Sequence, residues 1–177
     1  MPASSAGSTR VGVAVIFVTV GSQKFQFDRL LRAVDDLVSG GCVDGGAFAQ
    51  TGACTYVPVH MRHEAFLDRE SFRAHMDACD VVVTHGGTGA IIGAVKSGKK
   101  VIAVPRLSKY GEHVDDHQME IVCQFGAMGL IEPCMDLVDL SDAYARVIAH
   151  DYLPYQSNTE HFCADLSEYI DGIGGVR

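Results

Sequence analysis

Residues 80–98, DVVVTHGGTGAIIGAVKSG, contain the pattern that predicts the fold of this chain. Val81–Thr84 is a short run of β-branched residues, typical of a strand that is buried on both faces of a parallel sheet. His85–Gly89 is a glycine-rich turn, and Ala90–Ser97 is predicted to be a helix that ends at Gly98. A buried strand that leads through a short turn into a helix is the repeating unit of an α/β protein.

The same alternation continues on both sides of this unit. Apolar or β-branched runs predict further strands at Ala14–Val20, Ala47–Gln50, Thr55–Val57, Val101–Val104 and Gly129–Ile131. Apolar residues at helical spacing predict helices at Phe27–Val38, at Ser71–Ala78 with Ser71 as N-cap, at His113–Phe125, at Leu140–Ala149 and at Glu160–Ile170. This order predicts an α/β fold with a Rossmann-like, doubly wound parallel sheet.

Length and composition indicate one domain with a substantial core. The chain has 177 residues, of which 47% are hydrophobic, whereas disordered chains are poor in apolar residues. We expect a disordered leader at residues 1–10, the α/β domain at 11–150, and a linker with an acidic, partner-binding helix at 151–177. The six cysteines form no CxxC pair, so we interpret them as reduced core residues of a cytoplasmic protein.

The charge of the chain is acidic and unevenly distributed. Fourteen Lys and Arg residues against 22 Asp and Glu residues give a net charge of −8, which argues against a protein that binds nucleic acid by neutralising phosphates. Residues 132–177 hold 2 of the basic and 9 of the acidic residues. This acidic quarter is either a solvated surface or a docking surface for a basic partner.

Three segments should lie together at the carboxyl edge of the predicted sheet. They are Gly21-Ser22-Gln23, His85–Gly89 and Arg106–Gln118, each of which follows a predicted strand. Ligands of doubly wound sheets bind beyond the carboxyl ends of the strands. We therefore expect the functional site at this edge.

The glycine turns favour an anion site. Backbone N–H groups at Gly86, Gly87, Thr88 and Gly89, together with the Gly21-Ser22 loop, would hold a phosphate at the positive end of a helix dipole. The alternative is that glycine serves only the backbone angles of tight turns. Neither GxGxxG nor GxxxxGK[ST] occurs, so the diphosphate of a nucleotide-sugar is favoured over NAD or ATP. His85 is either a hydrogen-bonded core residue or a donor to the ligand.

Residues 105–118 concentrate polar side chains suited to sugar hydroxyls and phosphate. The candidate ligand-binding residues among them are Arg106, Lys109, Glu112, His113, Asp116, His117 and Gln118. The spacing of Glu112 and His113 with Asp116 and His117 also resembles that of a metal site. The pattern fits the capped, solvated first turn of a helix better, and no metal is expected.

Three stretches carry a resemblance to a known family: VTVGSQKFQFDRLLRAVDDL (18–37), DVVVTHGGTGAIIGAVKSGKKVIAVPR (80–106) and KYGEHVDDHQMEIV (109–122). They resemble the glycosyltransferase family 28 C-terminal domain, and in particular the soluble subunits of two-component glycosyltransferases from exopolysaccharide, capsule or dolichol-linked pathways. The resemblance implies the nucleotide-sugar-binding half of a GT-B enzyme. In that half, His85–Gly89 would hold the diphosphate and Asp116, His117 and Gln118 would lie at the donor sugar.

The resemblance also implies a function and a partner. The expected reaction is an inverting transfer from a UDP-sugar to a polyprenyl-diphosphate-linked saccharide, with no cofactor. A membrane-anchored subunit would bind the acceptor and hold this cytoplasmic chain at the inner face of the membrane. His85, Asp116 and His117 are the candidates for catalytic residues, and the general base is left unassigned between the two subunits.

Two other interpretations stay open. Many relatives carry a ribose-binding Glu in the helix after the glycine turn, where this chain has Gly93. A non-catalytic nucleotide-sugar-binding subunit that activates its partner is therefore the main alternative. The less favoured one is an unrelated nucleotide-binding or flavodoxin-like module.

Overall fold

The computed structural model describes residues 14–174, which include one six-stranded sheet in the order β3-β2-β1-β4-β5-β6. The strands are β1 (Ile16–Thr19), β2 (Ala47–Gln50), β3 (Arg62–Glu64), β4 (Val81–His85), β5 (Lys100–Val104) and β6 (Glu132–Pro133). All neighbouring strands are parallel. The predicted α/β fold with a doubly wound parallel sheet is confirmed.

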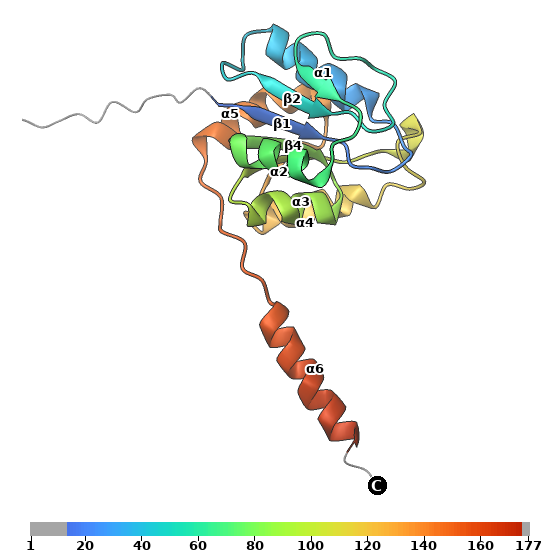
Figure 1. The fold of residues 1–177 in the computed structure, drawn as a ribbon, viewed down its shortest axis with the longest axis vertical. Coiled ribbons are helices and arrows are strands. Elements are labelled where there is room, and N and C mark those ends of the chain that lie inside the picture. The colour runs from blue at the N-terminus through green and yellow to red at the C-terminus, as the bar shows by residue number, and fades with distance from the viewer. Residues whose placement is uncertain (1–13, 175–177) are drawn as a thin grey trace, which may run out of the picture.

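Helices cover both faces of the sheet, as Figure 1 shows. Helices α1 (Asp28–Ser39) and α5 (Leu140–Ala149) enclose one apolar core, and α2 (Arg69–Ala78), α3 (Thr88–Lys96) and α4 (Gln118–Ala127) enclose the other. Two 3-10 turns, η1 (Ser108–Tyr110) and η2 (Leu137–Asp139), precede α4 and α5. Because β1, β4 and β5 are buried between these layers, their sequences are almost entirely apolar.

The C-terminal part of the described chain leaves this body. Helix α6 (Thr159–Gly174) projects from it on an extended linker (Figure 1). None of the described helices has the length and apolar character needed to cross a membrane. The predicted leader, residues 1–10, lies outside the described residues.

The predicted strand at Thr55–Val57 is wrong. The Asp28 carboxylate accepts hydrogen bonds from the backbone N–H groups of Thr55 and Tyr56 at 2.8 and 3.1 Å, and these bonds tie the segment to the start of α1. The third strand is instead Arg62–Glu64, an exposed edge strand of three polar residues. Such a strand has no apolar alternation, so hydrophobic periodicity does not reveal it.

The predicted start of a helix at His113 is also wrong, because α4 begins at Gln118. Two aspartates bind backbone groups in competition with a helical turn. Asp116 Oδ1 accepts from Ser108 N at 2.6 Å, and Asp115 Oδ1 accepts from His117 N at 3.3 Å. Residues 112–116 therefore form bends.

Two boundary predictions are corrected by local geometry. The N-cap of α2 is Asp68, whose carboxylate accepts from Ser71 N at 2.7 Å, so Ser71 is not the cap. The last strand, Glu132–Pro133, follows Gly129–Ile131 rather than coinciding with it, and Gly129 has a left-handed φ of +69°, outside the β region.

All six cysteines are free, but only part of the prediction that they are core residues holds. Cys79 and Cys134 are buried, whereas Cys42, Cys123 and Cys163 are exposed. Burial raises the pKa of both buried thiols to about 11, so these two are inert structural groups.

Candidate functional site at the carboxyl edge

The three predicted segments meet at one edge of the sheet. The strands that they follow are neighbours, with Thr19 of β1 paired with Thr84 of β4 and His85 of β4 paired with Val104 of β5. The prediction that these segments lie together at the carboxyl edge is confirmed. Their contacts with one another define the candidate site.

The first two segments pack around the imidazole of His85. A Cβ atom at Gly21, whose φ is +78°, would lie 2.8 Å from His85 Cε1. A Cβ atom at Gly87 would overlap His85 Nε2. Glycine at both positions therefore serves the close approach of the two turns to this ring, in addition to the backbone angle at Gly21.

His85 is a neutral imidazole at physiological pH. Burial, and then the positive charge of Arg106, lower the pKa of His85 to about 4. A neutral imidazole still has one N–H group to donate, but it brings no charge to a phosphate. The expected role of His85 as a hydrogen-bond donor stays a prediction.

The start of α3 offers unshared backbone donors beside His85. Its N-cap, Gly87, provides no side-chain cap, and the first turn holds no acidic residue. The first backbone bond that returns to the cap runs from Ile91 N to Gly87 O at 3.0 Å, so the N–H groups of Thr88 and Gly89 precede the helical ladder. This arrangement suits an anion, because the dipole of α3 adds to these donors.

The third segment contacts both glycine turns through Arg106 and Gln118. Arg106 is 1% exposed, and its Nη2 donates to Val20 O at 2.6 Å. Arg106 N donates to Gln118 Oε1 at 3.1 Å. A Cβ atom at Gly86 would lie 2.9 Å from Gln118 Cβ, so this glycine allows α4 to approach the turn.

Two of the predicted ligand-binding residues are buried and form hydrogen bonds within the protein instead. Glu112 is 1% exposed and accepts from Arg29 Nε at 2.6 Å and from Leu107 N at 2.9 Å. Arg106 is buried without a carboxylate partner among the described residues, and burial lowers its pKa. Neither side chain is placed to touch a ligand, although the Arg106 charge still acts through space.

The other candidates from this segment are more accessible. Lys109 is exposed at the tip of the loop, and Asp116 and His117 are exposed just before α4. Ser108 N–H donates to Asp116 and holds the pKa of that carboxyl below its usual range. Gln118 is 4% exposed, and the described residues offer its side-chain NH₂ group no acceptor. Binding of a donor by these residues stays a prediction.

One neighbour of the site, Asp115, was interpreted from the sequence only as a polar residue near a helix start and not as a ligand-binding residue. Asp115 contacts the Nδ1 atom of His117 and lies 3.3 Å from the Nδ1 atom of His113. Sequence analysis placed these residues on a helix, where Asp115 would point away from the two histidines. Asp115 stands two residues from each histidine in the sequence, and this spacing was the signal that could have indicated the contacts.

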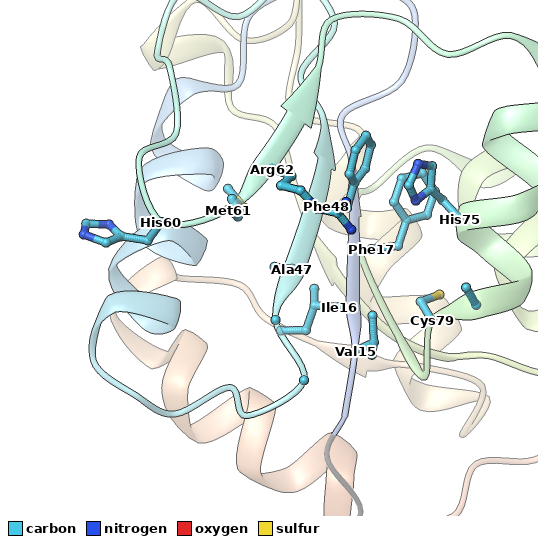
Figure 2. A pocket seen from close by; sticks show the side chains of 13 residues that line it. Val15, Ile16, Phe17, Ala47, Phe48, His60, Met61, Arg62, His75 and Cys79 are labelled. Atoms are coloured by element: carbon cyan, nitrogen blue, oxygen red, sulfur yellow. The ribbon is translucent and has the colours of Figure 1, made fainter.

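Two cavities lie near the sheet but differ in their relation to this site. A cavity of about 370 Å³ lies at the amino ends of β1, β2 and β3, and its lining residues are drawn in Figure 2. His75 stacks there on Phe48 with 3.7 Å between ring centroids. This cavity is therefore remote from the glycine turns. A groove of about 550 Å³ between α2 and α3 is lined by Gly89 and Gly93 and adjoins the glycine turn that precedes α3.

The family of the chain follows from its sequence as a whole. The model of the glycosyltransferase family 28 C-terminal domain matches residues 15–170. The chain belongs to this family. The matched range includes all three segments of the site and most of α6, so the family 28 domain accounts for nearly the whole described structure.

Two curated relatives of this family 28 domain bear the same name. The UDP-N-acetylglucosamine transferase subunit ALG13 of Candida glabrata is 32% identical over 81 residues, which are 45% of this chain and 39% of that protein. The subunit ALG13 of Mus musculus is 28% identical over 130 residues, which are 67% of this chain and 10% of that protein. The matched part of each relative is less than half of its length.

The fold comparison gives the same architecture. The crystal structure of the glycotransferase of kitacinnamycin matches with a TM-score of 0.60 at 16% identity, covering 82% of this chain and 37% of that chain. At this identity the likeness shows the fold alone. The family 28 domain has the Rossmann-like fold of a GT-B glycosyltransferase half, as predicted.

Proposed function

We propose that this chain is the donor-binding, catalytic subunit of a two-component inverting glycosyltransferase. It would transfer a sugar from a UDP-sugar to a polyprenyl-diphosphate-linked saccharide. The observation that carries the proposal is the meeting of two glycine turns around His85, beside the uncapped start of α3. A diphosphate fits this position because backbone donors and the helix dipole converge there.

The proposed transfer is a single displacement at the anomeric carbon. The acceptor hydroxyl oxygen forms the new glycosidic bond while the bond to the UDP oxygen breaks, and UDP leaves with the electron pair. The N–H groups at the start of α3 stabilise the charge that develops on the diphosphate, aided by the His85 N–H and the exposed Lys109. Gln118 and His117 bind hydroxyls of the donor sugar.

The general base takes the proton of the acceptor hydroxyl. With a pKa of about 4, His85 is a weak base at neutral pH. The Asp116 carboxylate already accepts the Ser108 N–H bond. His117 and a group on the partner subunit are therefore the two places to look for the base.

The donor to test first is UDP-N-acetylglucosamine. Both curated relatives are named as subunits of a UDP-N-acetylglucosamine transferase. The groove between α2 and α3 adjoins the anion-binding turn, so it is the position proposed for the nucleoside. Gly93, which faces open space in this groove, offers no side chain to the ribose.

The partner is proposed to be a membrane-anchored subunit that binds the acceptor. One Rossmann-like half forms a single wall of a cleft, whereas glycosyl transfer needs a second wall that excludes water. Helix α6 carries exposed Leu166, Tyr169 and Ile170 at helical spacing, which suits docking to another chain. Such docking would hold this chain at the cytoplasmic face of the membrane.

The alternative function is that of a non-catalytic subunit that binds a nucleotide-sugar and activates its partner. Gly93 favours this alternative, because the ribose-binding Glu implied by the family resemblance is missing. Calorimetry with UDP tests the binding step that both functions share. Binding of FMN or NAD without binding of UDP would contradict both.

Turnover of the reconstituted complex separates the two functions. We expect His85→Ala and Gln118→Ala to lower kcat/KM by about 100-fold, because each removes a group at the transferring centre. The matched controls are His75→Ala, at the opposite end of the strands, and Gln124→Ala, on the exposed side of α4. Near-normal turnover of the two test variants, with folding verified by circular dichroism, would favour the accessory role.

A further inference from the structure

We propose that His113, Asp115 and His117 form a three-ligand site for a divalent transition-metal ion such as Zn²⁺. One possible ligand atom from each of these residues lies within 4.8 Å of those from the other two. A set of two imidazole nitrogens and one carboxylate oxygen binds Zn²⁺ and its first-row neighbours in preference to Mg²⁺. Binding of an ion here is independent of the transfer reaction proposed above, which itself involves no metal.

The spacing of His113 and Asp115 fits one ion, whereas His117 must rotate away from Asp115 to make room for it. Asp115 Oδ1 lies 3.3 Å from His113 Nδ1 and contacts His117 Nδ1. Two ligands of a tetrahedral Zn²⁺ ion lie about 3.4 Å apart, given Zn–N and Zn–O bonds of about 2.1 Å. The side chains of Asp115 and His117 are 58% and 48% exposed, so small rotations are open to both.

His113 supplies an independent observation. Its side chain is only 11% exposed and packs against the Phe25 ring, with 5.2 Å between the ring centroids. Its Nδ1 atom is buried and has no hydrogen-bond partner among the described residues. A buried polar atom without a partner is destabilising. A metal ion at the cluster would give this nitrogen a partner.

The local backbone creates the cluster. Because residues 112–116 form bends rather than the first turn of a helix, Asp115 lies between the two histidines. The Asp115 side chain is 58% exposed, so its carboxylate is ionised at neutral pH as metal binding requires. With Nδ1 of His117 on the ion, its Nε2 atom stays available to the donor sugar.

The site has an open side. Three protein ligands leave a fourth position of a tetrahedral ion for water or a ligand oxygen. The exposure of Asp115 and His117 places that position toward solvent at the carboxyl edge. An oxygen-rich molecule bound at this edge would be the natural fourth ligand.

Metal titrations of the full chain test the proposal. The chain is prepared without a histidine tag, dialysed against a chelator, and titrated with Zn²⁺ by calorimetry and with Co²⁺ by visible absorption. We expect one ion per chain. Asp115→Asn and His117→Gln, which change partly exposed side chains, should each weaken binding by about tenfold or more.

Two controls exclude other ligands. Asp116→Asn changes a neighbouring carboxylate that bonds Ser108 N, so it should leave the affinity within about twofold of the native value. Alkylation of the exposed cysteines should likewise leave binding intact. A thiolate charge-transfer band in the Co²⁺ spectrum, or unchanged affinity in Asp115→Asn, would overturn the metal site. UDP titration of the metal-free chain is read separately, because it reports on the proposed function alone.

Discussion

At the scale of single residues, His85 is the side chain around which the site is packed. Cβ atoms added at Gly21 and Gly87 would fall nearest the Cε1 and Nε2 atoms of its ring, and its Nδ1 atom is 3.4 Å from Thr84 Oγ1. The Thr84 hydroxyl in turn donates to Thr19 O at 3.0 Å, which links β4 to β1 directly below the turns. The ring therefore couples the positions of both glycine turns.

Replacing Gly21 by Ala tests this coupling. We expect a loss of about 1–3 kcal/mol of unfolding free energy, because the new Cβ both occupies a left-handed backbone conformation and overlaps the His85 ring. Gly41→Ala is the matched control, since Gly41 has a φ of +73° and a Cβ atom added there would have nothing within 4 Å. Urea denaturation gives both values. Equal losses in the two variants would show that contact with His85 has no part in the effect.

The protonation of His85 makes stability depend on pH. Its pKa is about 4 in the folded chain, below the value of 6.5 for an unperturbed histidine, so the unfolded chain binds the proton more readily. The stabilisation is complete above pH 6.5 and is lost as the pH falls toward 4, to a total of about 3 kcal/mol. His85→Gln should flatten the stability curve between pH 6.5 and 4.5. An unchanged slope in this variant would contradict the lowered pKa.

At the scale of elements, the start of α3 is rich in glycine, although glycine does not favour a helix. Its glycines leave room for His85 and expose backbone donors, but glycine is a poor helix former. Gly86 and Gly87 each have a neighbour that a Cβ atom would overlap, whereas Gly89 and Gly93 have none within 4 Å. Neighbouring atoms therefore require glycine in the turn before α3 but not at Gly89 and Gly93 within the helix.

Gly93 is the position in α3 where a side chain can be added. We expect Gly93→Ala to stabilise the chain by about 0.5–1 kcal/mol, because alanine favours the helix and the space is open. Gly93→Glu should in addition raise the affinity for UDP, if the nucleoside lies in the adjoining groove. Urea denaturation and UDP calorimetry measure the two effects separately. A loss of stability in Gly93→Ala would show that α3 is packed differently there.

At the scale of the whole molecule, we propose separate roles for the α/β body and α6. Leu166, Tyr169 and Ile170 are 44%, 67% and 53% exposed, so these three apolar side chains of α6 are not buried on the body. In contrast, Tyr155 in the linker packs with Lys96 of α3, whose Nζ lies 5.2 Å from the ring centroid. The body therefore extends through Tyr155, and the proposed docking element begins after it.

Deletion of residues 157–177 tests the role of α6. We expect the melting temperature of the body to stay the same, because Tyr155 and both cores are retained. Co-purification with the proposed membrane-anchored subunit should be lost. Tyr169→Asp is the matched point variant, since it places a charge on the exposed apolar side of α6. Complex formation at the native level in both variants would remove α6 from the proposed interface.

The sequence by itself determined the parallel sheet, its central strands and the meeting of three segments at one edge. These features depend on local signals, because buried parallel strands are continuously apolar and tight turns need glycine. It also indicated the family, through stretches that include the glycine turn and the polar loop before α4.

Only the tertiary structure decided which polar side chains are accessible at that edge. Glu112 and Arg106 are buried by partners 83 and 86 residues away in the sequence, and no local pattern announces such contacts. The start of α4 was likewise decided by side-chain bonds of Asp115 and Asp116, which compete with the helical turn that the apolar spacing favours. Long-range contacts and local side-chain hydrogen bonds together thus decided the chemistry of an edge whose position the sequence had already set.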